Sequence, residues 1–247
     1  MNPLNLDEYD QQSLYSFQNE HDSCGVGLVV NISGEKSHEI IENGLQVLEN
    51  MVHRGAESAD NKTGDGAGML VQIPHEFILL QGIPVPAIGK YGTGLVFLPR
   101  EKKEAELCLR IIKENVEEEN LHLLAVRDVP VNSDILGEIS ASNEPQIKQI
   151  FVTGTLRQEE LERKLYQVRK KIENSITKSN LTNRRSFYMV SLSTKVLIYK
   201  GMLTSLQLRD YYTDLTNPNF TSAIALVHSR FSTNTFPTWD LAQPFRM

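Results

Sequence analysis

The pattern of apolar and polar positions changes abruptly at Cys24. Residues 1–23 are polar and lack periodicity, whereas residues 24–31, CGVGLVVN, form a glycine-punctuated apolar run that is typical of a buried strand. No other boundary in the chain is as sharp. We therefore expect a propeptide-like leader over residues 1–23 and one folded domain over residues 24–247.

Helical and strand patterns then follow each other along the domain. Apolar residues recur on one helical face between residues 37 and 53, and residues 66–73 form a second strand that ends before Pro74. The remaining strands are expected at 92–99, 121–129, 147–154, 186–193, 195–201 and 221–231, and the remaining helices at 101–119, 158–177 and 205–212. In the helix over 101–119, Cys108 lies on the apolar face and is predicted to be a core residue.

This order of elements decides between two fold classes. Strands come in runs with interspersed helices, and no βαβ period repeats, so the pattern favours α+β layers over a doubly wound parallel sheet. The last strand, 221–231, is predicted to be central and to deliver His228, Ser229 and Arg230 to its carboxyl end.

Composition narrows the range of partners. The chain has 247 residues, of which 40% are hydrophobic and 23% charged, and its formal charge of −6 is spread along the sequence. It is long enough for a substantial core, and nothing in it indicates a surface for nucleic acid or an anionic membrane. No apolar run approaches the roughly 18 residues of a membrane span, and the first residues do not form a secretory signal. The two cysteines have no metal-type spacing, so we expect no metal site and a reducing, cytoplasmic setting.

Cys24 has two interpretations. A single cysteine at the start of an apolar strand usually packs as a small apolar residue. The context also suggests chemistry, since cleavage before Cys24 would place its thiol beside its own free α-amine. Such an amine titrates at about pH 8 and can act as the base for the thiol, directly or through a water.

A glycine-rich segment follows the first predicted helix. It contains Arg54 within HRGAESAD, and then Gly64, Gly66 and Gly68 within TGDGAG. The segment lacks the Lys-Ser/Thr of a phosphate-binding loop and the spacing of a dinucleotide fingerprint. A tight turn that enters a strand is the better interpretation, with Arg54 either solvated at the surface or directed into a site.

Arg230 also allows two interpretations. It stands at the end of a predicted buried strand and is followed by Ser232, Thr233 and Asn234. A guanidinium with hydroxyl and backbone groups nearby is suited to bind a carboxylate, although a structural ion pair would give the same pattern.

Four segments in this order resemble one family. They are DSC at the end of the leader, CGVGLVV, VHRGAESADNKTGDGAGMLVQIPH and VHSRFSTNTFPTWDLAQP. Over essentially the whole chain the sequence resembles the class II glutamine amidotransferases, and among them the amino-terminal domains of glutamate synthase large subunits. The resemblance implies the amino-terminal nucleophile (Ntn) hydrolase fold, an αββα sandwich of two antiparallel sheets flanked by helices.

The resemblance also implies roles for individual residues. Cys24 would attack the side-chain amide of glutamine to give a γ-glutamyl thioester and ammonia, and water would then release glutamate. Arg230 matches the arginine that binds the α-carboxylate of glutamine, and Thr233 would assist through its backbone or hydroxyl. Arg54 matches the arginine beside the nucleophile.

For the parent enzyme, the resemblance implies that ammonia passes to a site that aminates 2-oxoglutarate reductively. FMN and an iron–sulfur cluster would serve that reaction, and no cofactor is expected for residues 1–247. The implied partners are glutamine, the remaining domains of the large subunit, and a reductase small subunit or ferredoxin.

One departure from the family changes the expected activity. The family follows its AQP segment with an Asn-Gly pair that forms the oxyanion hole, and this pair would lie beyond Met247. We therefore expect a domain that is incomplete at its carboxyl end and has little glutaminase activity alone, because loss of one oxyanion donor costs about 10²- to 10³-fold. Two other functions stay open: an Ntn cysteine amidase of other specificity, and a non-catalytic ligand-sensing domain in which Cys24 is only packed. A papain-like protease is disfavoured, since His21, His53 and His228 lack a partner motif.

Overall fold

The computed structural model describes residues 24–60, 62–232 and 235–244, apart from the side chain of Arg185. Its strands form two antiparallel sheets of four strands each. The first sheet has the order β1 (Gly25–Val30), β8 (Ile224–Ser229), β2 (Ala67–Gln72) and β7 (Val196–Gly201). The second sheet has the order β4 (His122–Asp128), β5 (Gln146–Thr153), β3 (Tyr91–Leu98) and β6 (Tyr188–Met189).

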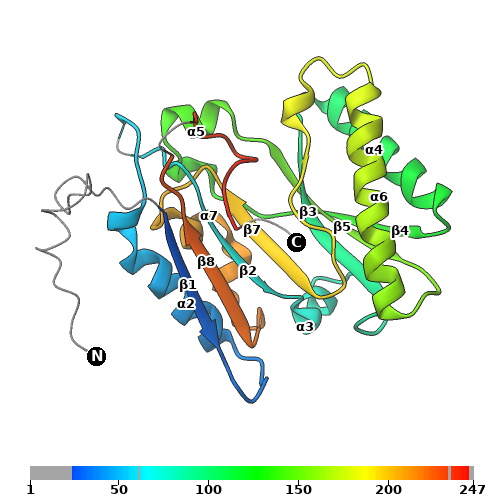
Figure 1. Cartoon of the computed structure of the whole chain (residues 1–247), viewed down its shortest axis with the longest axis horizontal. Coiled ribbons are helices and arrows are strands. Elements are labelled where there is room, and N and C mark those ends of the chain that lie inside the picture. Colours follow the sequence, from blue (N-terminus) through cyan, green and yellow to red (C-terminus); the bar gives the residue numbers. More distant parts are fainter. Residues whose placement is uncertain (1–23, 61, 233–234, 245–247) are drawn as a thin grey trace, which may run out of the picture.

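Helices cover the outer faces of the two sheets (Figure 1). Helix α2 (His38–Asn50) runs along β1 and β8, where Gly44 allows close approach: a Cβ at this position would lie 2.7 Å from the Cβ of Ala225. Helices α4 (Lys102–Glu118) and α6 (Gln158–Lys178) pack together on the second sheet. The predicted α+β sandwich of two antiparallel sheets between helices is thus confirmed.

Between the sheets, one apolar cluster contains residues of both. Leu95 and Phe151 contribute from the second sheet, and Ile198 and Tyr199 from β7 of the first. Strand β7 is buried along its length after Val196, because it lies where the two sheets meet.

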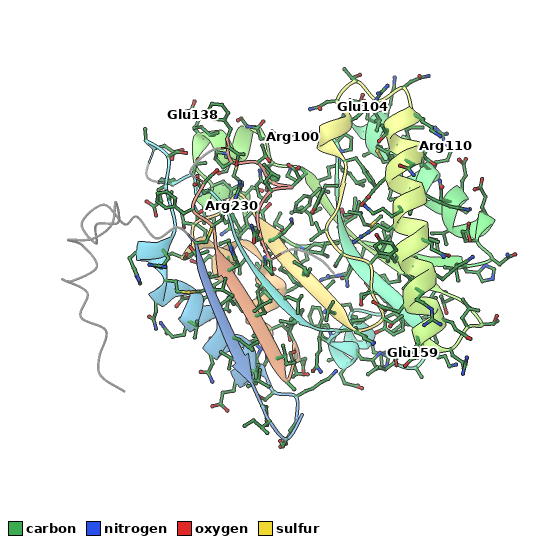
Figure 2. All side chains as sticks on the ribbon, in the orientation of Figure 1. Arg100, Glu104, Arg110, Glu138, Glu159 and Arg230 are labelled. Atoms are coloured by element: carbon green, nitrogen blue, oxygen red, sulfur yellow. The ribbon has the colours of Figure 1, made fainter. Side chains whose placement is uncertain are left out.

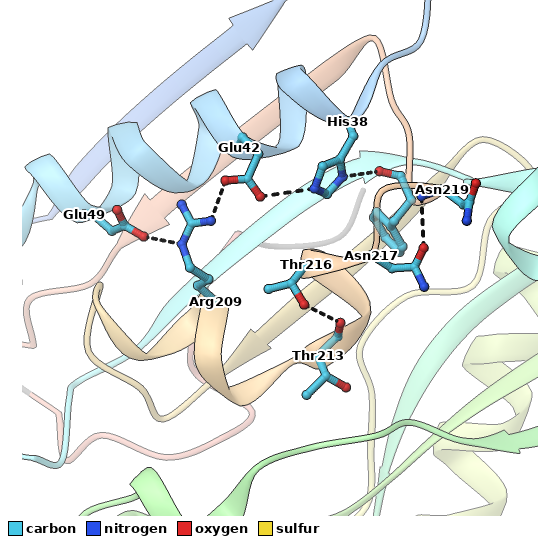
Figure 3. Close-up of polar contacts among 9 residues, drawn as sticks. His38, Glu42, Glu49, Arg209, Thr213, Thr216, Asn217 and Asn219 are labelled. Atoms are coloured by element: carbon cyan, nitrogen blue, oxygen red, sulfur yellow. Dashed lines mark hydrogen bonds and ion pairs between the residues drawn. The ribbon is translucent and has the colours of Figure 1, made fainter.

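Short helices complete the fold: α3 (His75–Leu80), α5 (Glu138–Ser142) and α7 (Gln207–Tyr211). Helix α7 is tied to α2 by Arg209, which donates to Glu42 at 2.5 Å and to Glu49 at 2.7 Å (Figure 3). His38 extends the same network, with Nε2 3.1 Å from Glu42 and Nδ1 3.0 Å from the carbonyl of Phe220. These contacts lie on the helix side of the first sheet.

The predicted strand over 186–193 is wrong for most of that range. Only Tyr188 and Met189 pair with β3 as a strand. The chain then crosses Gly94 so closely that a Cβ there would lie 1.7 Å from the carbonyl oxygen of Ser191. Pairing with β3 continues only irregularly past this point: the N–H of Val190 donates to the carbonyl of Leu95 at 2.9 Å, and Ser193 forms an isolated bridge with Thr93.

Cys108 is a core residue, as predicted. Its side chain is fully buried in the cluster under α4 and α6, and burial raises the pKa of its thiol to about 12. A thiol in this state does not react. Within the ranges that the structure describes, no helix is both long and apolar enough to cross a membrane.

Candidate functional site

Cys24 and Arg230 meet at one edge of the first sheet. Strand β1 begins with Gly25 paired to Ser229 at the end of β8, so the residues just outside this pair are Cys24 and Arg230. The backbone N–H of Phe231 donates to Cys24 Sγ at 3.4 Å, and the thiol lies 3.7 Å from the carbonyl oxygen of Phe231. Antiparallel pairing therefore brings together two residues that are far apart in sequence.

The backbone of Cys24 is unusual. Its φ of 65° lies in the left-handed region, which residues other than glycine rarely adopt. Its side chain is only half-buried, in contrast to that of Cys108. A strained, partly accessible cysteine at a sheet edge differs from a packed core residue, although strain alone does not define its role.

Arg230 is buried, with only 9% of its surface exposed, and lies beside the strand ends of the first sheet (Figure 2). Its backbone N–H donates to the carbonyl of Gly66 at 2.8 Å. Its Nη2 donates to Thr235 Oγ1 at 2.8 Å and to Ser232 Oγ at 3.4 Å. Its Nη1 is buried and has no hydrogen-bond partner among the described residues. A buried charged donor without an acceptor is costly unless a ligand completes it.

Asp65 supports the loop that follows Arg230, and sequence reasoning did not single it out. Its Oδ2 accepts the backbone N–H of Ser232 at 2.5 Å. Burial raises the pKa of this carboxyl, while the bond from Ser232 and the nearby charge of Arg230 oppose the shift. The only sequence signal was an acidic residue between two glycines, which turns often contain.

Arg54 lies next to the start of β1. A Cβ at Gly25 would be 3.0 Å from the Cβ of Arg54 and 2.8 Å from the sulfur of Met51, so Arg54 packs directly against the residue after Cys24. It is half-buried, at the end of the 3₁₀ turn Val52–Arg54. The structure thus brings Arg54, Cys24 and Arg230 into one region. Thr233 lies outside the described residues, as does the leader.

The glycines of TGDGAG serve close packing of backbone. A Cβ at Gly64 would lie 2.2 Å from the carbonyl oxygen of Leu203, and one at Gly68 would lie 2.3 Å from that of Gln243. Gly66 also has φ +144°, which favours glycine. These contacts explain the motif without a phosphate ligand, in agreement with the turn interpretation.

His228 lies on β8 two residues before Arg230. It is 6% exposed, and its Nδ1 has no hydrogen-bond partner in the part of the chain that the structure describes. Burial and then the charge of Arg230 lower its pKa to about 4, so the ring is neutral near pH 7. A neutral imidazole leaves Arg230 as the cation of this strand end.

A large cavity is separate from this site. It has a volume of about 960 Å³ and is lined by the loop from Thr235 to Leu241 together with residues such as Arg100 and Tyr188. Neither Cys24 nor Arg230 lines it. Proximity to the thiol and the buried guanidinium, and not cavity size, therefore defines the candidate site.

The described residues do not suit a metal or an iron–sulfur cluster. They contain no group of three or more His, Cys, Asp and Glu side chains placed to hold a metal ion. Iron–sulfur clusters are typically held by about four cysteine thiolates, whereas Cys108 is enclosed in the core and Cys24 stands alone at the sheet edge. The site offers a partly accessible thiol at Cys24 and a buried guanidinium at Arg230.

Comparison with known proteins gives a consistent result. Residues 24–247 match the family model described as Glutamine amidotransferases class-II. The chain is 43% identical over 253 residues to Glutamate synthase [NADH] of Saccharomyces cerevisiae, which covers 96% of the chain and 12% of that protein. It is 43% identical over 234 residues to Ferredoxin-dependent glutamate synthase 2 of Synechocystis sp.; this match covers 92% of the chain and 15% of that protein. Glutamate synthase [NADPH] large chain of Bacillus subtilis is 41% identical over 240 residues; this match covers 95% of the chain and 16% of that protein. The chain thus spans between 12% and 16% of the length of these relatives.

Proposed function

Because the chain belongs to the class II glutamine amidotransferases, we propose that Cys24 is the nucleophile with which the longer protein that contains this domain releases ammonia from the side-chain amide of glutamine. The observation that carries this proposal is the buried Nη1 of Arg230, which has no partner among the described residues and stands one residue from the backbone that contacts Cys24 Sγ. An α-carboxylate at Nη1 would complete the hydrogen bonding of Arg230 and place the ligand beside the thiol.

The chemistry requires a free amino terminus at Cys24. We propose that the leader over residues 1–23 is removed, so that the α-amine of Cys24 accepts the proton of its own thiol, directly or through a water. The sulfur then attacks the amide carbon of glutamine, the carbon–nitrogen bond breaks, and the nitrogen leaves as ammonia with the transferred proton. Water adds to the resulting thioester and releases glutamate, which regenerates the thiol.

Three residues would bind and orient the substrate. Arg230 binds the α-carboxylate, Thr233 assists from the loop that follows, and Arg54 adds positive charge beside the nucleophile. The support for this set is the geometry of the two arginines around Cys24: Arg54 packs against Gly25, and Arg230 precedes Phe231.

For the longer protein that contains this domain, we propose glutamate synthase activity. Its other domains would use the ammonia to aminate 2-oxoglutarate, with FMN and an iron–sulfur cluster bound outside residues 1–247 and electrons supplied by a reductase subunit or a ferredoxin. The support is the similarity to the amino-terminal portions of relatives named as NADH-, NADPH- and ferredoxin-dependent enzymes. A cytoplasmic location is proposed on the two free cysteines.

Two measurements test the proposal. Intact mass after expression should show an amino terminus at Cys24, and incubation with a diazoketone analogue of glutamine should add one equivalent of reagent at Cys24. Cys24→Ser should abolish the labelling, whereas Cys108→Ser, which alters only the buried thiol, should leave it unchanged. An unprocessed leader together with a Cys24 that does not react would refute the nucleophile and favour a non-catalytic domain.

A further inference from the structure

Lys200 is a lysine in the interior, where this residue type is rarely found. It lies on β7, where the two sheets meet, and is 1% exposed. Its Nζ donates to the carbonyl oxygen of Ala242 at 2.6 Å and to that of Asp240 at 2.8 Å. It also lies 4.5 Å above the centre of the Tyr188 ring. One buried amino group thus binds two carbonyls of a segment about forty residues later in sequence.

That segment, residues 239–244, is called the strap below. It crosses the first sheet over Gly66, just before β2, and Gly68, within β2, because neither residue has a side chain in its way. A Cβ at Gly66 would lie 2.9 Å from the Cβ of Ala242, and one at Gly68 would lie 2.3 Å from the carbonyl oxygen of Gln243. The two glycines therefore allow the strap to pack directly on the backbone of the sheet.

Trp239 fixes the start of the strap. Its Nε1 donates to the carbonyl of Ser140 at 3.1 Å, and its ring packs on Gly201, where a Cβ would lie 2.5 Å from it. Lys200 precedes Gly201 on β7, so both anchors of the strap come from the end of one strand. The strap is held by side-chain donors and lies outside the eight strands of the two sheets.

The strap connects to Arg230 by two short routes. Thr235, which accepts a hydrogen bond from Arg230 Nη2, lies only five residues before Asp240. Gly66, which lies under Ala242, accepts the backbone N–H of Arg230. A strap that moved would therefore shift the hydroxyl partner of the guanidinium and would uncover Gly66, to which the backbone of Arg230 is bonded.

We propose that Lys200 is a positioning residue for the glutamine site: it holds the strap, and through the strap it fixes Thr235 and Arg230 in the geometry that binds an α-carboxylate. This inference rests on the proposed function. The effect on ligands should depend on their carboxylate, because Lys200 acts through Arg230 and does not contact the thiol region.

The test uses the whole chain with Lys200→Met, which keeps an unbranched side chain of similar length and removes all three donors. Two quantities are measured: hydrogen exchange of the strap amides, including Leu241, whose N–H donates to Thr238 at 3.1 Å, and the rate of alkylation of Cys24. Alkylation is compared between the diazoketone analogue of glutamine and iodoacetamide, which carries no carboxylate. We expect faster exchange in the strap, labelling by the glutamine analogue slowed on the order of tenfold, and labelling by iodoacetamide unchanged within about twofold.

Tyr212→Phe is the matched control. The Tyr212 hydroxyl is buried and donates to the backbone carbonyl of Lys200 at 2.7 Å, so its loss weakens the same strand without touching the strap. It should lower stability and leave the ratio of the two alkylation rates as in the wild type. If Lys200→Met does not fold, Ala242→Gly loosens the strap at Gly66 and should shift the ratio in the same direction.

Three results would overturn the inference. Protection of the strap amides that persists in Lys200→Met would show that Lys200 does not hold the strap. Equal slowing of both reagents would assign Lys200 a purely structural role. A wild-type chain that reacts without preference for the carboxylate-bearing reagent would refute the proposed function and the action of Lys200 on Arg230. The exchange data would still report separately on whether Lys200 holds the strap.

Discussion

Arg230→Gln tests whether this residue binds the substrate carboxylate. Glutamine is polar and shorter than arginine, and it lacks the positive charge. In the wild type, Nη2 is engaged by Thr235 and Ser232, while Nη1 is the buried donor with no partner in the described part of the chain. The substitution therefore removes the donor that is available to a ligand.

The magnitude follows from that one contact. A hydrogen bond between charged groups contributes about 1.5–3 kcal/mol, and about 1.4 kcal/mol corresponds to a factor of ten. The rate of Cys24 labelling by a carboxylate-bearing reagent should therefore fall about 10- to 150-fold. The loss should be confined to ligands that carry an α-carboxylate, since Cys24 and its contact with Phe231 do not involve the guanidinium.

The assay compares two reagents on two proteins. Second-order rates of Cys24 alkylation are measured by mass spectrometry for the diazoketone analogue of glutamine and for the same compound without its α-carboxylate. The ratio of the rates should fall about 10- to 150-fold in Arg230→Gln. Arg209→Gln is the control, because the guanidinium of Arg209 binds Glu42 and Glu49 of helix α2 (Figure 3).

Equal slowing of both reagents in Arg230→Gln would contradict the reasoning. Arg230 would then support the fold of the loop without binding the carboxylate, which is the structural ion-pair interpretation that the sequence left open. An unchanged ratio together with unchanged rates would place the carboxylate elsewhere.

Three further outcomes follow from buried groups. Asp214→Ala should lower the free energy of unfolding in denaturant titrations by about 3–5 kcal/mol, because it leaves the bidentate Arg127 without its carboxylate, and the Arg127→Met/Asp214→Leu pair should restore most of it. The folded-state pKa of His228 is lowered to about 4 from 6.5. The free energy of unfolding should therefore be at its full value above about pH 6.5 and should fall by about 3 kcal/mol toward pH 4. The variant His228→Gln should remove this loss from the pH profile. Gly94→Ala would place a Cβ 1.7 Å from the carbonyl oxygen of Ser191. It should lower the free energy of unfolding by about 3 kcal/mol or more. A melting temperature equal to that of the wild type would show that the two backbones separate freely.

Much of the fold could be predicted because the apolar periodicity is strong where elements are long. Helix α6 was expected over 158–177 and runs from Gln158 to Lys178, with Leu161, Leu165 and Val168 buried at helical spacing. Helix α3 was not predicted, since six residues, HEFILL, are too few to show a period and the four apolar residues in a row among them also suit a strand.

The site was only partly visible in the sequence. The sequence marks Cys24 and Arg230 as candidates because each directly flanks an apolar strand in a motif with recognisable chemistry. Lys200 and Asp65 could not, because their roles depend on where a later segment crosses β2. Lys200 reads as an ordinary polar residue in KVLIYKG, and only the position of the Asp240 and Ala242 carbonyls shows why it is buried.

The conformation of Cys24 links the leader to the chemistry. The torsion φ is defined by the carbonyl carbon of the preceding residue, so the value of 65° describes Cys24 while it is still joined to Ser23. A left-handed conformation costs a residue with a Cβ about 1–2 kcal/mol. Cleavage before Cys24 removes the preceding carbonyl and with it this cost, while the pairing of Gly25 with Ser229 and the contact between Sγ and Phe231 can persist. We therefore propose that relief of this strain favours the cleavage before Cys24, which would place the free α-amine beside the thiol that needs a base.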